Sequence, residues 1–219
     1  MKQVLLSVCV VVTLNVAVTG QDFKETLKNT VAMFDTAGSP DGMFAAANRL
    51  DLISKKWDTS AIAQYYCAYA FTILSFVEPD EGKKDAYLDK SDAYLAKARE
   101  LAKKDNDEFY VMAAFIANAR LAVKPQSRWK KYGDIFNDDI AKAREFNPDN
   151  PRIYYLQGNS IYHTPKMFGG GEKNALPYFQ KADTLFKNET DTNIFKPYWG
   201  KEQNSDLLKK CQTEMEEQD

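Results

Sequence analysis

Three consecutive glycines, Gly169 to Gly171, precede a lysine in the stretch TPKMFGGGEKNALPYFQKA, and glycine-rich loops of this kind can cradle a phosphate. A phosphate-binding loop needs a preceding strand and a Gly-Lys-Ser/Thr ending, whereas this stretch follows a helical pattern and reads Gly-Glu-Lys-Asn. Asn174 also replaces the third glycine of a dinucleotide-binding fingerprint. We therefore interpret the glycines as an enlarged corner between two helices. Met167 and Phe168 are expected to tuck under this corner, with a binding lip as the alternative.

The other residues that could do chemistry are few. His163 is the only histidine, and no serine or cysteine motif marks a nucleophile for it to activate. The acidic runs DNDE (105–108) and NDD (137–139) lack the glycine and ligand spacing of a calcium loop and suit helix capping. We expect no catalytic residue, no metal site and no cofactor. A hydrolase that uses His163 would need a serine or carboxylate brought beside it by the fold.

The first twenty residues, MKQVLLSVCVVVTLNVAVTG, have the layout of a secretory signal peptide: a lysine, an apolar run and small residues at the end. The apolar run is shorter than the ~20 residues that a membrane-spanning helix needs, and Asn15 interrupts it. Cleavage after Gly20 would leave residues 21–219 as a single exported domain, periplasmic or secreted, with no transmembrane segment. Cys67 and Cys211 would then lie in an oxidising compartment, where they could form a disulfide or stay as separate small apolar residues.

The composition predicts a folded protein that does not bind nucleic acid. Of the 219 residues, 44% are hydrophobic, which is enough for an ordinary core. The 29 basic residues do not exceed the 31 acidic ones, so no basic surplus is available to neutralise a phosphate backbone.

The chain beyond the signal peptide is predicted to be all-α. Apolar residues recur three and four positions apart almost throughout, and polar turns such as AGSPDG, KKDND and NPDNP separate the helical segments. Because the turns are short, neighbouring helices should be antiparallel. The expected helices are 22–37, 41–57, 59–78, 80–104, 107–123, 127–146, 151–163, 171–187 and 201–217.

Two of the turns share a pattern. In AKARELAKKDNDEFYVMAA and AKAREFNPDNPRIYYLQG, an alanine is followed eleven residues later by an aromatic: Ala98 by Phe109, and Ala143 by Tyr154. These stretches resemble the tetratricopeptide repeat, a helix-turn-helix unit with small residues where paired helices cross. Ala143 and Pro148 fit the closing alanine and proline that precede the last unit. That unit, at 151–187, matches best, with these residues in the aromatic and small positions: Tyr154, Gly158, Ala175, Phe179 and Ala182.

The resemblance implies a short right-handed superhelix of antiparallel helix pairs, with about eight to nine helices in all. The last helix is expected to be a cap, with Tyr198 and Trp199 wedged beneath it. Terminal repeats need such a cap because their apolar face is otherwise exposed.

In tetratricopeptide repeats the first helix of each pair lines a concave groove, so the resemblance implies a tyrosine-rich recognition surface there. The candidate residues are Tyr65, Tyr69, Tyr110, Asn118, Arg152, Tyr155, Asn159 and Tyr162. We expect a non-enzymatic scaffold that binds a protein or peptide partner in this groove. The sequence does not identify that partner. The alternative is a small-ligand transport accessory similar to the T component of tripartite ATP-independent periplasmic transporters.

Overall fold

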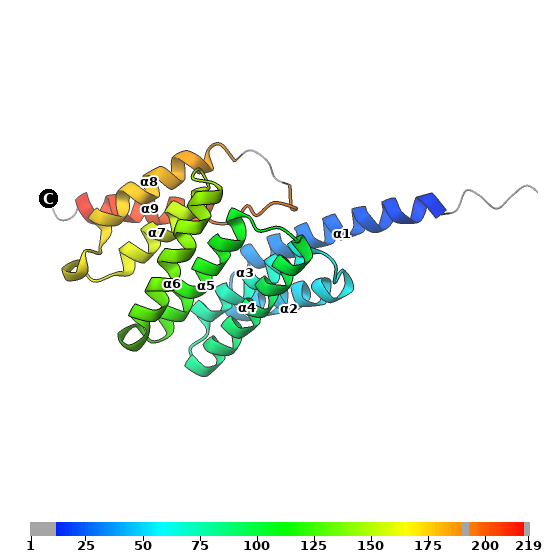
Figure 1. Ribbon diagram of the computed structural model, residues 1–219, viewed down its shortest axis with the longest axis horizontal. Coiled ribbons are helices and arrows are strands. Elements are labelled where there is room, and N and C mark those ends of the chain that lie inside the picture. The colour runs from blue at the N-terminus through cyan, green and yellow to red at the C-terminus, as the bar shows by residue number, and fades with distance from the viewer. Residues whose placement is uncertain (1–11, 190–192, 217–219) are drawn as a thin grey trace, which may run out of the picture.

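The computed structural model describes residues 12–189 and 193–216, with side chains from residue 22 onward. This part of the chain is all-α, as predicted, and contains nine α-helices, one short 3₁₀ helix and no strand (Figure 1). The helices are α1 (Val12–Asp35), α2 (Pro40–Lys56), α3 (Ala61–Val77), α4 (Glu81–Ala102), α5 (Asp107–Val123), α6 (Pro125–Phe146), α7 (Pro151–His163), η1 (Lys166–Phe168), α8 (Glu172–Phe186) and α9 (Lys201–Glu216).

Local sequence signals place the helix ends close to where they were predicted. The side chains of Ser39, Asp80 and Asn106 each accept a hydrogen bond from a backbone N–H in the first turn of the helix that follows. Proline, which needs no N–H partner, occupies the first turn of α2, α6 and α7. The first helix differs from its prediction, because α1 extends back to Val12, within the predicted signal peptide.

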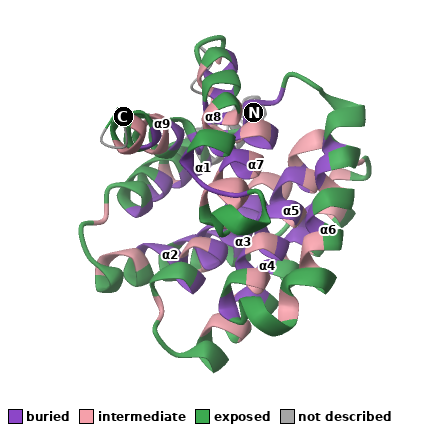
Figure 2. Cartoon of the chain, turned by 90° about the vertical axis from the view of Figure 1, so that its left-hand side faces the viewer, coloured by how far each residue is buried: buried purple, intermediate pink, exposed green. Residues whose placement is uncertain are grey.

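The helices pack as successive antiparallel pairs: α1 with α2, α3 with α4, α5 with α6, and α7 with α8, with α9 lying along α8. The first helices of neighbouring pairs also touch, α3 with α5 and α5 with α7. Figure 2 shows the buried faces of these helices turned toward one another, with exposed residues on the outer faces. The helical-repeat arrangement expected from the sequence is therefore confirmed.

Gly158 and Phe179 make a close contact between α7 and α8, at positions where the repeat pattern predicts a small and a large residue. Gly158 of α7 lies so close to Phe179 of α8 that a Cβ on the glycine would be 2.7 Å from the Cε1 atom of the ring. Phe179 is fully buried, as are Ala175 and Ala182 on the same face of α8. The small and large residues thus interlock as the repeat pattern predicts.

Replacing Gly158 with alanine should destabilise the protein by about 1–3 kcal/mol relative to Gly133→Ala, because the added methyl overpacks against Phe179. Gly133, in the middle of α6, is the matched control, since its nearest neighbour would be 4.0 Å from a new Cβ. Urea unfolding followed by far-UV circular dichroism would measure both variants. Equal stability of the two would contradict the packing described here.

The triple glycine turns a corner between α7 and α8, as the sequence predicted. Gly169 and Gly171 have φ angles of 83° and 94°, a region that L side chains rarely adopt. Gly170 passes so near Thr164 that a Cβ would be 1.8 Å from the carbonyl oxygen of that threonine. The N–H of Gly171 also donates to the carbonyl of Ile161, 3.0 Å away, so the corner is tied back to α7.

The prediction that Met167 and Phe168 tuck under this corner is wrong. Met167 is 82% exposed and Phe168 is 72% exposed. The backbone of Gly170 packs directly against Thr164 and takes up the space under the turn. Both apolar side chains of η1 consequently face outward.

Cys67 and Cys211 are both buried and do not pair with each other. Cys67 and Cys211 are free thiols, and burial raises their pKa values, to about 12 and about 11 respectively. Cys67 therefore serves as a small core residue of α3, the second of the two predicted alternatives. Within the described ranges, no helix combines the length and apolar character that crossing a bilayer requires.

Candidate functional site

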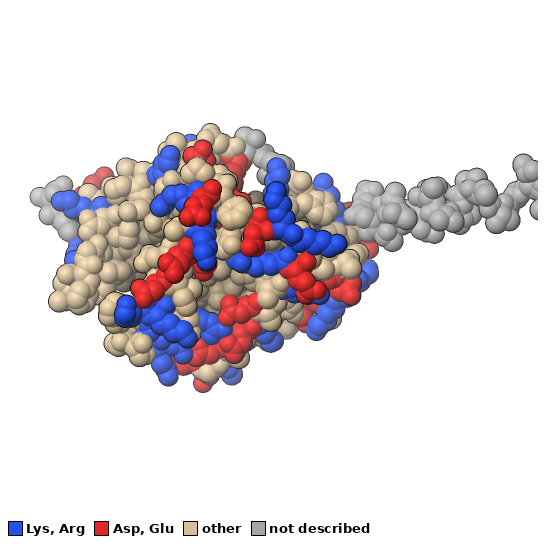
Figure 3. Space-filling view, in the orientation of Figure 1, with Lys and Arg blue, Asp and Glu red and all other residues tan. Residues whose placement is uncertain are grey.

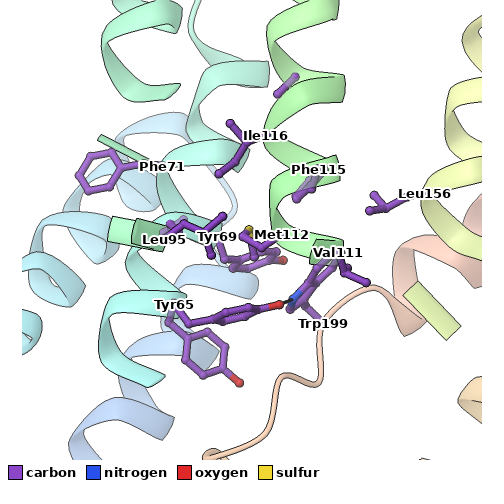
Figure 4. Close-up of a cluster of buried hydrophobic side chains, with 14 of the residues drawn as sticks. Tyr65, Tyr69, Phe71, Leu95, Val111, Met112, Phe115, Ile116, Leu156 and Trp199 are labelled. Atoms are coloured by element: carbon purple, nitrogen blue, oxygen red, sulfur yellow. Dashed lines mark hydrogen bonds between the residues drawn. The ribbon is translucent and has the colours of Figure 1, made fainter. Parts of the chain in front are cut away.

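The structure brings four of the predicted groove residues together and buries them. Tyr65 and Tyr69 of α3 and Arg152 and Tyr155 of α7 are each exposed by 8% or less. They are covered by residues 193–200, the stretch that directly precedes α9. We call this stretch the groove segment. Figure 4 shows its tryptophan, Trp199, inserted beside Tyr65 and Tyr69.

Trp199 is the centre of this contact. Its indole N–H donates to the hydroxyl of Tyr65, 2.9 Å away. Its ring stacks on those of Tyr69 and Phe115, with both centroid distances at 5.3 Å, and meets Tyr155 edge-on at 6.3 Å. Instead of lying only under the terminal helix, as the sequence predicted, this side chain reaches α3, α5 and α7.

Other residues of the groove segment fix its path. The Tyr66 hydroxyl donates to the Lys196 carbonyl at 3.2 Å, and the Tyr66 ring packs on Tyr198 with a centroid distance of 6.1 Å. Phe195 packs on Phe23 of α1 at 6.0 Å. The concave face is thus occupied by the chain's own segment, and its tyrosines belong to the core.

Arg152 is the most unusual residue of this core, since its charged side chain is only 1% exposed. Nη1 donates to Oε1 of Glu108 at 3.1 Å and to Oε1 of Glu189 at 2.8 Å, while Nη2 donates to Oε2 of Glu189 at 3.0 Å and to the Pro197 carbonyl at 2.7 Å. Glu108 also accepts a hydrogen bond from Tyr65 at 3.0 Å. Arg152 therefore joins α5, α7, the end of α8 and the groove segment through buried charge.

The pKa shifts in this cluster indicate a structural role for its side chains and not a catalytic one. Burial raises the pKa of Tyr65 and Tyr69 well above the ordinary value, and that of Tyr155 to about 12. Burial also raises the pKa of Glu108, although the charge of Arg152 opposes part of that rise. The tyrosines stay protonated at neutral pH and supply neither a base nor an anionic ligand.

A cleft of about 570 Å³ opens beside the cluster, at the N-terminal ends of α3 and α5. Its lining includes Ile62, Phe109, Phe195, Asp107, Glu108 and Glu189. Lys196 also lines the cleft, so its wall is partly apolar and partly charged, with both signs of charge present. A second hollow of about 630 Å³ shares Glu108 and Glu189 with the first and is lined mainly by polar residues.

The other four predicted groove residues do not converge on this cluster. Tyr110 donates to Asp105 at 2.9 Å and stacks on Phe146 with a centroid distance of 5.4 Å. Tyr162 donates to Glu214 of α9, also at 2.9 Å. Asn118 and Asn159 are partly exposed. The predicted set is therefore divided between a buried cluster and separate surface contacts.

Sequence reasoning missed the two carboxylates that accompany Arg152. Glu108 lies in the run interpreted as a helix cap, and Glu189 lies 37 residues after Arg152. A buried arginine requires such partners, but its burial is visible only once the groove segment is in place. The spacing of Glu108, Arg152 and Glu189 in the sequence does not predict that they lie together.

His163 ends α7 next to the glycine corner and is exposed. Its ring meets that of Tyr162 edge-on at 5.0 Å. Among the described residues it forms no hydrogen bond with a serine or a carboxylate, so the arrangement required by the hydrolase alternative is not seen there. The same part of the chain contains no group of three His, Cys, Asp or Glu residues placed to hold a metal ion.

The chain resembles a haemophore of known structure. The chain is similar to the solved structure of the HusA haemophore from Porphyromonas gingivalis, with 33% sequence identity and a TM-score of 0.75. The match covers 89% of this chain and 95% of that one. No model of a known protein family matches the sequence, and no curated protein matches it either.

Proposed function

Because this chain belongs to the family of the HusA haemophore, we propose that it is an exported, non-enzymatic protein that binds haem or a closely related porphyrin. The observation that carries the proposal is the 33% identity, which extends over 95% of the HusA chain and not over an isolated helix pair. The predicted signal peptide at residues 1–20 supports export. The helical-repeat fold suits a binding protein, since it presents surfaces without placing nucleophiles and bases together.

Haem sets requirements that can be compared with the residues present. It is a flat apolar ring with two carboxylates and an iron atom that takes a His, Cys, Met or Tyr ligand. The concave face meets these requirements poorly, because Trp199 fills it and its tyrosines are held protonated. The adjacent cleft is lined by Asp107, Glu108, Glu189 and Lys196, and Arg152 already pairs with both glutamates, so the cleft offers the haem carboxylates no surplus of positive charge.

Binding of a protein partner on the concave face has less support, because the groove segment already occupies that face. A peptide could enter only after the groove segment had left its contacts with Tyr65, Tyr66 and Arg152. The transport-accessory alternative shares with our proposal the binding of a small ligand, and haem is the more specific choice because of the relative.

Titrating haemin into the protein comprising residues 21–219 should give a saturable change in the Soret absorption band. We expect the change to end at a fixed ratio of haem to protein, because the haem would occupy a defined site. The same titration into protein unfolded in urea is the control. A haemin spectrum that is identical in the presence of folded and unfolded protein would contradict the proposed function.

A further inference from the structure

The corner between α7 and α8 displays the two most exposed large apolar side chains of the described residues. Met167 is 82% exposed and Phe168 is 72% exposed, ahead of Leu52 and Trp129, each at 64%. The corner projects from the end of the molecule opposite the start of α1 (Figure 1), and this edge shows few charged side chains in Figure 3. Adjacent apolar side chains held in solvent mark a surface that gains from being covered.

Hydrogen bonds fix the turn that holds these two side chains outward. The side-chain amide of Asn174 donates to the carbonyl oxygens of Gly169 and Gly170, at 3.1 Å and 3.3 Å. The N–H of Gly171 donates to the carbonyl of Ile161, so the turn is tied to α8 on one side and to α7 on the other. The apolar pair is therefore displayed by a built corner, and no rearrangement is needed before it meets a partner.

This apolar surface is too small to hold another folded protein by itself. A stable protein–protein interface buries roughly 800 Å² on each partner. A large side chain such as phenylalanine contributes about 150–250 Å² when it is buried. Met167 and Phe168 together would supply only about half of the area that a second copy of the chain needs. A projecting apolar pair can instead enter a lipid layer, which requires no complementary surface.

The exposed charged side chains of the corner are lysines. Glu172 is the only carboxylate in residues 150–182, and it is buried in an ion pair with Lys166. Lys166 and Lys173 are both exposed, one on each side of the three glycines. The exposed charge of the corner is therefore positive, which is complementary to the phosphate groups of lipids.

The neighbouring helix α9 does not cancel this positive charge. Lys210 and Glu214 of α9 lie 3.9 Å apart, so their charges offset each other. Glu214 also accepts a hydrogen bond from Tyr162 of α7 at 2.9 Å, which holds the carboxylate against that helix. The lysines of the corner thus face solvent beside an ion pair with no net charge.

We infer that this corner docks on a phospholipid membrane, with Met167 and Phe168 among the lipids and Lys166 and Lys173 beside the phosphate groups. Lysine suits this position because its apolar stem can lie along the lipid while its ammonium reaches the headgroups. Binding is peripheral and reversible, since only two apolar side chains enter the bilayer. The inference adds a membrane surface as a partner and does not depend on the proposed binding of a porphyrin.

The test measures how much of the protein (residues 21–219) sediments with vesicles. One kind of vesicle contains phosphatidylcholine alone, and the other contains phosphatidylcholine and phosphatidylglycerol. Wild-type protein should bind both kinds, and should bind the anionic vesicles more tightly at low salt than at high salt. Met167→Ala combined with Phe168→Ala should weaken binding to both kinds about tenfold or more, because the lost contact is apolar.

Two single variants complete the comparison. Lys173→Gln should weaken binding to the anionic vesicles about fivefold and should change binding to phosphatidylcholine vesicles much less. Leu52→Ala, which removes an exposed apolar side chain of α2, is the matched control and should behave as wild type. Far-UV circular dichroism checks that each variant keeps its helical content.

Three results would overturn the inference. Equal sedimentation of the wild type and the Met167, Phe168 double variant would show that the corner is not the docking surface. A wild-type protein that sediments with neither kind of vesicle would rule out the membrane as the partner. If gel filtration shows a wild-type dimer that the double variant loses, a second copy of the chain covers the corner instead.

Discussion

Replacing Arg152 with methionine should lower the free energy of unfolding by about 3–5 kcal/mol. The Arg152 side chain is 1% exposed, and its Nη1 atom lies 3.1 Å from Glu108 and 2.8 Å from Glu189. Methionine fills much of the same volume but leaves Glu108, which is only 17% exposed, without its positive partner. Urea unfolding followed by far-UV circular dichroism would measure the loss.

The size of this loss should depend on pH. Burial already raises the pKa of Glu108 in the folded protein, and removing Arg152 should raise it further. The protonated carboxyl contributes stability that is fully present below the unfolded pKa of about 4.3 and is lost as the pH rises through the folded pKa. The variant should therefore be closer to wild type at about pH 5 than at about pH 8.

Two further variants test this cause. Adding Glu108→Gln to Arg152→Met should recover part of the stability and remove the pH dependence, since the neutral amide needs no counter-charge. Arg144→Met alters an exposed arginine of α6 that bonds Gln157 at 2.8 Å, and it should change stability by less than about 0.5 kcal/mol. A pH-independent loss in Arg152→Met that Glu108→Gln leaves untouched would contradict the charge explanation.

Replacing Trp199 with alanine should cost about 3–5 kcal/mol of stability. The side chain is 5% exposed and stacks on Tyr69 and Phe115. Its loss would leave a cavity between α3, α5 and α7 and would take away the indole N–H that donates to Tyr65. Thermal and urea unfolding would both report this change.

Trp129→Ala is the matched control for this prediction. Trp129 of α6 is 64% exposed, so its removal should change stability by no more than about 0.5 kcal/mol. Trp199→Phe should fall between the two, because phenylalanine keeps part of the ring stacking and lacks the N–H donor. Equal unfolding midpoints for Trp199→Ala and Trp129→Ala would mean that the groove segment adds nothing to the fold.

Most of the helical architecture could be predicted from the amino-acid sequence. Helix starts follow from residues such as Ser39 and Asn106, whose side chains bond the first free N–H groups wherever the rest of the chain goes. The contact between Gly158 and Phe179 follows from the spacing of small and large residues on facing helices. These features depend on residues near one another in sequence or on one helix pair.

The candidate site depended on contacts between distant parts of the chain. Tyr65 and Tyr69 have the spacing of a recognition surface. Trp199, more than a hundred residues later in the sequence, packs against both and buries them in the core. The direction of Met167 and Phe168 was likewise open, because it depends on how closely Gly170 packs on Thr164. Helix periodicity records which residues share a face, and only the packed chain shows whether that face meets solvent or another segment.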